Sequence, residues 1–237
     1  GMKKSHIATL TVFFVLIPLT LIVGSRLSGR AFYITSTLVI VELLIPFFLA
    51  FEGRRPQARE LVVLAVMCAL AVAGRVAIPI PSFKAIFGII MIAGIAFGPE
   101  SGFLVGAISA LASNFFYSQG PYTPWQMMAY GAGGMLAGFV FAEGRLPRKP
   151  VVMGIFGFLA VAFFVGPLLD TCSVFLVMSR ISLKGAMAFY ISGFPVNLRQ
   201  AVATAIVLLV LGKPLLEKLD RIKTKYGILD DEGRKEA

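Results

Sequence analysis

The sequence predicts an all-α membrane protein built as a bundle of transmembrane helices. Of its 237 residues, 58% are hydrophobic and only 14% are charged, and the mean hydropathy is +0.87. An average soluble domain is far less apolar. Several segments reach the roughly 20 apolar residues that a helix needs to cross a bilayer, and the alternating pattern of membrane strands is not evident. The predicted location is therefore the cell membrane, crossed several times.

Eight apolar segments follow one another along the chain. The polar linker EGRRPQARE separates the first two, which are poor in glycine, from the rest. We interpret residues 1–57 as a two-helix addition, residues 58–213 as a six-helix core and residues 214–237 as a cytoplasmic tail that begins as an amphipathic surface helix. The apolar segments are 6–25, 31–51, 58–79, 85–98, 101–117, 125–142, 151–178 and 194–212.

The basic residues predict the orientation of the bundle. With the N-terminus inside, 15 of the 22 Lys and Arg residues fall on the inner side. Basic residues concentrate in cytoplasmic loops, so the predicted orientation is N-in and C-in. It places the turn IPIPSFK, the hairpin SQGPYTPWQ and the stretch Ser179–Pro195 on the outer face. Because the charges lie mostly in loops and in the tail, the net charge of +10 indicates a lipid bilayer and no nucleic-acid partner.

Two glycine-rich helices flank the hairpin. The first carries Gly102, Gly106 and Ala110 at four-residue spacing, and the second carries Gly134 and Gly138 likewise. This spacing puts small residues on one face, where helix backbones can approach closely in lipid. The glycine and two prolines of the hairpin exclude a continuous helix, so we expect a rigid polar turn there.

The hairpin and its surroundings carry the candidate binding residues. Rigid aromatic rings with a few fixed polar groups are typical of small-molecule sites. An ordinary interfacial loop, with its aromatic residues in the membrane-interface belt, is equally compatible with the composition. The predicted substrate-binding residues are Asn114, Gln119, Tyr122, Thr123, Trp125, Gln126 and Tyr130, together with the cations Arg75, Lys84 and Arg199.

Two carboxylates lie inside predicted membrane segments, where a charge is costly. Glu42 is interpreted as a protonated or hydrogen-bonded structural residue, with a proton relay as the alternative. Asp170 is expected to form an ion pair with Arg199, which would offset the cost of burial. A self-sufficient proton-coupled secondary transporter that uses both carboxylates is an alternative function. A membrane scaffold that transports nothing is another.

Missing motifs exclude most enzymes. The sequence has no P-loop, and its only histidine is His6, so a histidine-ligated zinc site and a Ser–His catalytic pair are excluded. Cys68 and Cys172 both fall in apolar segments and are interpreted as packing residues. We therefore expect no catalytic residues, no metal and no cofactor.

The third apolar segment contains a row of alanines, Ala65, Ala69, Ala73 and Ala77, at four-residue spacing. Such a row forms a flat, narrow ridge along one helix face, which is suited to docking another helix. The ridge could pack inside the same chain or against a partner protein.

From residue 58 to about residue 212 the chain resembles the substrate-binding S-components of energy-coupling factor (ECF) vitamin transporters. The resemblance rests on the alanine row, the IPIPSFK turn, the run GIAFGPESGFLVGAISALASN and the motif QGPYTPWQM before a glycine-rich helix. It implies an S-component-like six-helix core that binds a vitamin at its outer side. It also implies that Ala65, Ala69 and Ala73 dock on a transmembrane coupling subunit, which carries two cytoplasmic ATPases of the ABC type.

The hairpin looks most like that of family members assigned to cobalamin. A corrinoid is broad, edged with amides and free of strong charge, so the polar residues of the hairpin would match it by hydrogen bonding. Riboflavin, another flat vitamin or a corrinoid precursor would satisfy the same residues. The two additional N-terminal helices depart from the usual pattern of the family.

Overall fold

The computed structural model describes residues 58–120, 122–141, 144–178 and 182–227, together with a few N-terminal residues that include the short π-helix η1 (Val12–Leu16). These residues form helices and turns and contain no strand, which confirms the all-α class for this part of the chain. The two predicted N-terminal segments, 6–25 and 31–51, lie almost entirely outside the described residues.

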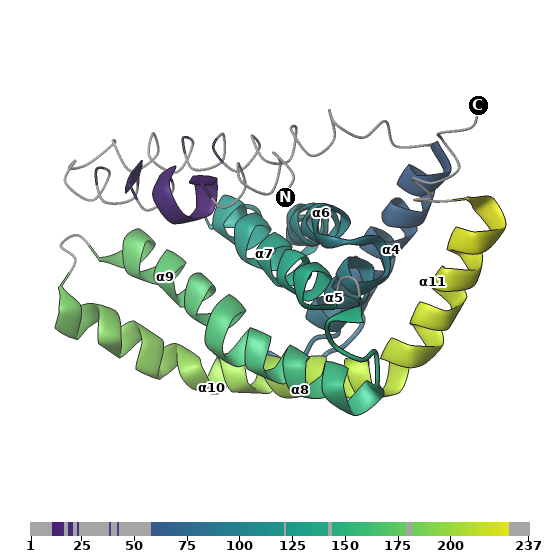
Figure 1. Cartoon of the computed structure of the whole chain (residues 1–237). Coiled ribbons are helices and arrows are strands. Elements are labelled where there is room, and N and C mark those ends of the chain that lie inside the picture. The colour runs from purple at the N-terminus through teal and green to yellow at the C-terminus, as the bar shows by residue number, and fades with distance from the viewer. Residues whose placement is uncertain are drawn as a thin grey trace.

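Between residues 58 and 227 the described helices join into six continuous segments (Figure 1). Four of them are single helices, and the last two each contain a π-helical turn. The segments are α4 (Ala58–Val76), α5 (Ile86–Phe97), α6 (Pro99–Tyr117), α7 (Thr123–Phe141), α8 (Pro150–Ala160) with η3 (Val161–Val165) and α9 (Gly166–Val177), and α10 (Leu183–Val207) with η4 (Leu208–Gly212) and α11 (Lys213–Tyr226).

Helix α5 is the centre of the fold. Every one of its 12 residues is buried, and it packs against α4, α6, α7, α10 and α11. A helix of this length extends about 18 Å, at 1.5 Å per residue, which is less than the roughly 30 Å of a bilayer core. The short fourth apolar segment is therefore an internal helix that the others surround. Its uniformly apolar sequence follows from burial on every side.

Glycines bring α5, α6 and α7 into backbone contact. A Cβ atom added to Gly102 would lie 2.7 Å from Gly94 Cα of α5 and 2.6 Å from the carbonyl carbon of Gly134 of α7. A Cβ atom at Gly138 would lie 2.6 Å from Pro99 Cα. Real Cβ atoms do not approach other atoms so closely, so only glycine fits at these points. The predicted small-residue faces of the two glycine-rich helices are confirmed.

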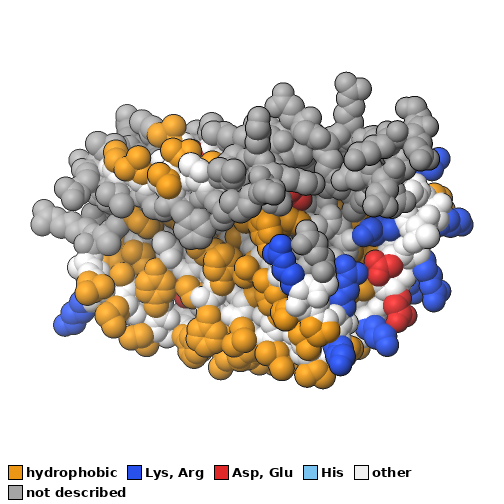
Figure 2. Space-filling view, viewed as in Figure 1, with side chains coloured by type: hydrophobic (Ala, Val, Ile, Leu, Met, Phe, Trp, Pro, Cys, Tyr) orange, Lys and Arg blue, Asp and Glu red, His pale blue; other side chains and the backbone are white. Residues whose placement is uncertain are grey.

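Two of the described segments are long and apolar enough to cross a membrane: Pro150–Val177, with 28 residues, and Leu183–Tyr226, with 44 residues. Figure 2 shows an apolar face over α8, α9 and α10, bordered at one side by the Lys and Arg residues of α11. An exposed apolar surface beside a basic end is typical of membrane helices. The exposed apolar side chains of these two segments include Val151, Ile155, Leu159, Phe163, Ile191, Val202 and Val210.

Helix α10 begins earlier than predicted. The predicted start of the last apolar segment at residue 194 is wrong, because the helix already starts at Leu183, so most of the stretch Ser179–Pro195 is helical. The outer location of this stretch stays a prediction. The Ser182 side chain caps this start by accepting a hydrogen bond from the Gly185 backbone N at 3.2 Å. Pro195 lies inside the helix, a position that membrane helices tolerate because neighbouring helices compensate for the lost hydrogen bond.

Helix α11 continues from α10 but turns across one end of the bundle (Figure 1). The π-helical turn η4 and the proline in the first turn of α11 coincide with this change of direction, and both features are common causes of helix kinks. Leu216 and Leu219 of α11 are buried in the core, while Lys218, Arg221 and Lys225 are exposed. The predicted tail thus begins with an amphipathic helix that packs on the core.

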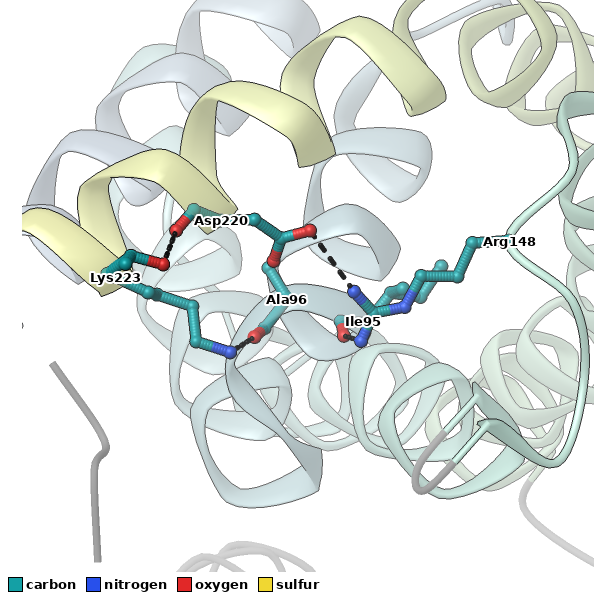
Figure 3. Close-up of polar contacts among 6 residues, drawn as sticks. Ile95, Ala96, Arg148, Asp220 and Lys223 are labelled. Carbon is teal, nitrogen blue, oxygen red and sulfur yellow. Dashed lines mark hydrogen bonds and ion pairs between the residues drawn. The ribbon is translucent and has the colours of Figure 1, made fainter. Parts of the chain in front are cut away.

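Two basic side chains attach this end to the last carbonyls of α5 (Figure 3). Lys223 of α11 donates to the Ala96 carbonyl at 2.7 Å, and Arg148 donates to the Ile95 carbonyl at 3.1 Å. Arg148 also lies 3.4 Å from the Asp220 carboxylate of α11. The last carbonyls of a helix lack intrahelical partners and form the negative end of its dipole, so these cations stabilise the end of α5.

We expect the substitution Lys223→Met to lower the free energy of unfolding by about 1–2 kcal/mol, because it leaves a carbonyl of α5 without its charged donor. The measurement is the thermal midpoint of the detergent-purified protein. Lys218→Met is the control, since Lys218 is exposed on the same helix, and it should leave the midpoint unchanged. An equal loss in both variants would show that the contact with α5 has no special role.

Candidate functional site

Most of the predicted binding residues lie where α4 ends and where α6 turns into α7. Arg75 lies in the last turn of α4, Asn114 lies near the end of α6, and Gln126 lies in the first turn of α7. This end of the bundle is opposite α11, because α11 packs near the start of α4, where the Arg59 guanidinium lies 5.9 Å from the Tyr226 ring centroid.

Asn114 is the centre of a hydrogen-bonded network between three helices. Its Oδ1 accepts a hydrogen bond from Arg75 Nη1 of α4 at 2.9 Å. Its Nδ2 donates to Gln126 Oε1 at 2.7 Å and to Thr123 Oγ1 at 3.1 Å, both on α7. The side chain is completely buried. An amide can hold this position because it carries both an acceptor and donors.

The turn between α6 and α7 is held by its own polar groups. Thr123 Oγ1 accepts from the Gly120 backbone N at 3.1 Å and donates to Gln119 Oε1 at 2.9 Å. Gln119 Nε2 donates to the Leu111 carbonyl at 2.9 Å. Helix α7 begins at Thr123 and not at residue 125 as predicted, because the ring of Pro124 is compatible with the first turn of a helix. The turn is thus short, and its polar groups bond to one another and to α6.

Arg75 lies close to two tyrosine rings. Its Cζ is 4.9 Å from the centroid of Tyr117 and 5.6 Å from that of Tyr130, distances typical of cation–π contacts. Arg75 Nη1 also donates to Ser113 Oγ, and the Tyr117 hydroxyl donates to the Arg75 carbonyl at 2.9 Å. The guanidinium is therefore fixed by groups on both α6 and α7.

Lys84 brings a second cation to the same end. It belongs to the turn before α5, and its Nζ donates to the Ile78 carbonyl of that turn. Lys84 Nζ also lies 5.9 Å from the Tyr117 ring centroid. Arg75 and Lys84, which come from different elements, thus flank the same aromatic ring.

The site thus consists of fixed polar groups and aromatic rings at one end of a helical bundle. A comparison of the sequence with known families supports the resemblance to S-components. The model of a family described as ECF-type riboflavin transporter, S component, matches residues 56–217. The chain belongs to this family. The S-component resemblance is thereby confirmed, and the family is one of membrane-embedded transporter subunits and not of enzymes. No curated protein and no solved structure matches the chain significantly.

The family description names riboflavin, so the match does not confirm the predicted preference for cobalamin. It fits the alternative ligand, riboflavin, that the sequence left open. Among the described residues of this S-component, no group of three or more His, Cys, Asp or Glu side chains is placed to hold a metal ion.

Trp125 packs on the α9 side of α7, outside the polar network. It is only 2% exposed and stacks on Phe175 of α9 at 5.7 Å between ring centroids. Met128, Cys172 and Val12 complete this apolar cluster. Trp125 therefore anchors the start of α7 in this S-component, and its contact with a ligand stays a prediction.

Tyr122 borders the same apolar cluster. Its hydroxyl donates to the Ser118 carbonyl at 2.9 Å. Tyr130, in contrast, is buried beside Arg75 and makes an edge contact with Phe87 of α5 at 4.6 Å. Of the predicted aromatic residues, Trp125 and Tyr122 thus lie on the α9 side of α7, whereas Tyr130 lies beside Arg75 in the network.

The sequence reasoning missed Ser113 and Tyr117. Tyr117 lies three residues after Asn114, a spacing that places both on the same helix face, so the helical period could have indicated it. Ser113 is completely buried beside Arg75, and only its position next to Asn114 pointed to it.

The predicted ion pair between Asp170 and Arg199 is wrong. Asp170 Oδ2 accepts a hydrogen bond from Asn197 Nδ2 at 2.7 Å, and Gly193 also lies against the Asp170 carboxylate. Helix residues two apart point about 200° away from each other, so Arg199 faces away and is exposed. Within the described part of the chain, no hydrogen bond or ion pair joins Arg199 to the Asn114 network.

Glu42 is one of the few described N-terminal residues. Its Oε1 accepts a hydrogen bond from the Thr20 hydroxyl. This contact fits the interpretation of Glu42 as a hydrogen-bonded structural residue of the S-component.

The alanine ridge lies at the surface. Ala65, Ala69 and Ala73 are exposed along α4, and the neighbouring Val62 and Val66 are exposed as well. The ridge is thus accessible to another protein or to lipid. Because its side chains are small, a second helix could approach it closely.

Proposed function

We propose that this S-component binds a flat vitamin, with riboflavin as the first candidate, at the end of the bundle formed by α4, α6 and α7. The observation that carries the proposal is the Asn114 network, which fixes Arg75 and Gln126 in place. Preformed polar groups beside aromatic rings suit a planar ring system, whose face can stack and whose edge can form hydrogen bonds. The description of the matching family favours riboflavin over other flat vitamins.

A corrinoid is the second candidate ligand. The α6–α7 turn exposes Gln119, and Gln126 is only half-buried, so both amides lie near the surface of the turn. They would match the amide groups at the edge of a corrin ring. Cobalamin therefore serves as the parallel ligand in every binding experiment.

The proposed orientation places α11 in the cytoplasm and the Asn114 network outside, in a protein that crosses the cell membrane several times. It is supported by the concentration of exposed basic residues at the α11 end, since such residues favour the cytoplasmic side. The exposed basic residues at that end are Arg59, Arg145, Arg148, Lys149, Lys213, Lys218, Arg221 and Lys225.

The alanine ridge is proposed to dock on a transmembrane coupling subunit that carries two ATPases. We expect Ala69→Trp to abolish copurification with the coupling subunit, because the indole would hold the two helices apart. Vitamin affinity should stay unchanged, since Ala69 lies about 9 Å from Arg75 along the helix, at 1.5 Å per residue. Ile155→Trp, at an exposed position of α8, is the control and should not affect copurification. A large loss of vitamin affinity in Ala69→Trp would contradict this division of roles.

The function as a whole is tested by uptake of labelled riboflavin, and of cobalamin in parallel, into proteoliposomes. Uptake should require both the coupling subunit with its ATPases and ATP. Uptake by the chain alone under a proton gradient would contradict the proposal and would support a secondary transporter.

A further inference from the structure

Among the described residues, the end of the bundle that carries the Asn114 network has cations without matching carboxylates. Arg75 and Lys84 both lie within 6 Å of the centroid of the Tyr117 ring. Within the described part of the chain, neither forms an ion pair. The two cations therefore lie beside an exposed aromatic ring and have no described carboxylate as a partner.

The described carboxylates have other partners or lie elsewhere. Glu42 accepts a hydrogen bond from the Thr20 hydroxyl. Glu60 and Glu100 lie in the first turns of α4 and α6, and Glu217 and Asp220 belong to α11, so all four are at the opposite end. Asp170 accepts a hydrogen bond from the Asn197 side chain of α10. None of these groups can neutralise the cations of the network.

The donors of these cations are only partly used. Arg75 Nη1 donates to Ser113 and Asn114, whereas Arg75 Nη2 and Nε form no hydrogen bond with the described residues. A guanidinium presents its donors in a planar fork that matches an oxyanion. Lys84 is half-buried and uses its ammonium on one backbone carbonyl, which leaves further donors.

The position of Arg75 and Lys84 at this end also differs from the usual distribution of basic residues in membrane proteins. Membrane proteins place few basic residues outside, and a partly buried charge is costly without a partner. From these observations we infer that the ligand of this site carries an oxyanion, a phosphate or a carboxylate, which Arg75 binds with the help of Lys84. This inference rests on the proposed vitamin site and goes beyond uncharged riboflavin, since it predicts that a ligand with an oxyanion, such as a phosphorylated flavin, binds there more tightly.

Two flavins that differ by one phosphate test the inference directly. The phosphate ester, riboflavin 5′-phosphate, should bind the wild-type protein at least about ten-fold more tightly than riboflavin at the same ionic strength, because it gains charge-assisted hydrogen bonds. Arg75→Gln should remove this preference, and Arg75→Lys should restore part of it. Lys184→Gln is the control, since it removes an exposed cation of α10 outside the network.

Equal affinity for the two flavins would overturn the inference and leave the vitamin site intact. If neither flavin binds, the proposed ligand is wrong, and the oxyanion inference is decided by inorganic phosphate and acetate at fixed ionic strength. A rise in the thermal midpoint with either anion, lost in Arg75→Gln, would support the inference and tell phosphate from carboxylate. No rise with either anion would overturn it.

Discussion

Replacing Asn114 by leucine is expected to weaken vitamin binding by at least about a hundred-fold, because the site would lose the group that aligns its parts. The substitution removes the acceptor of Arg75 and the donor to Thr123 and Gln126. Each polar group left unsatisfied in a buried position costs about 1–3 kcal/mol, and 1.4 kcal/mol corresponds to about ten-fold in affinity. The measurement is equilibrium binding of riboflavin and of cobalamin to the purified variant.

Gln119→Leu is the matched control for this prediction. Gln119 is an amide of the same turn, but it is exposed and bonds to the Leu111 carbonyl of α6 and to Thr123, with no bond to Arg75 or Gln126, so its loss should weaken riboflavin binding far less. The thermal midpoint of both variants is recorded to separate misfolding from loss of the site. Binding that survives in a folded Asn114→Leu protein would contradict the assignment of the network to the ligand site.

The largest loss of stability is expected for Gly134→Ala. The added Cβ would lie 2.7 Å from the carbonyl carbon of Gly102 and 2.8 Å from Ile90 Cγ2. Backbone atoms cannot rotate out of the way, so α6 and α7 would have to separate, at a cost of about 3 kcal/mol or more. We expect the variant to aggregate or to show a strongly lowered thermal midpoint in detergent.

Gly133→Ala is the control, because it adds the same methyl group one residue earlier. Its new Cβ would meet only side-chain atoms, with Val165 Cγ2 nearest at 2.9 Å, and a valine methyl can shift. A small effect at Gly133 beside a severe one at Gly134 would confirm backbone contact between the helices. Similar behaviour of the two variants would count against it.

Local periodicity explains what the sequence could predict. The four-residue spacing of glycines marked the contact faces of α6 and α7, since such spacing fixes which residues share a face. The alanine row on α4 was visible for the same reason. Asn114 and Gln126 stood out because polar residues are rare in apolar segments, and Thr123 stood out as a polar residue of the hairpin. The structure brings all three together.

The rotation of apolar helices explains what the sequence could not predict. On a segment that is apolar all round, nothing in the pattern shows which side faces a given neighbour. Asp170 was therefore paired with Arg199, whereas α10 turns Asn197 toward it. Trp125 stood in a polar turn, yet its partner is Phe175, fifty residues later in the chain. Such long-range choices depend on packing between helices.

The most direct test of the vitamin site is the amount of riboflavin that the purified wild-type protein retains after free ligand is removed, with cobalamin measured in parallel. The account predicts a retained flavin or corrinoid spectrum at close to equimolar amounts, and its loss in the folded Asn114→Leu protein. Retention of neither vitamin by the wild type, or equal retention by both proteins, would contradict the assignment of the Asn114 network as the binding site.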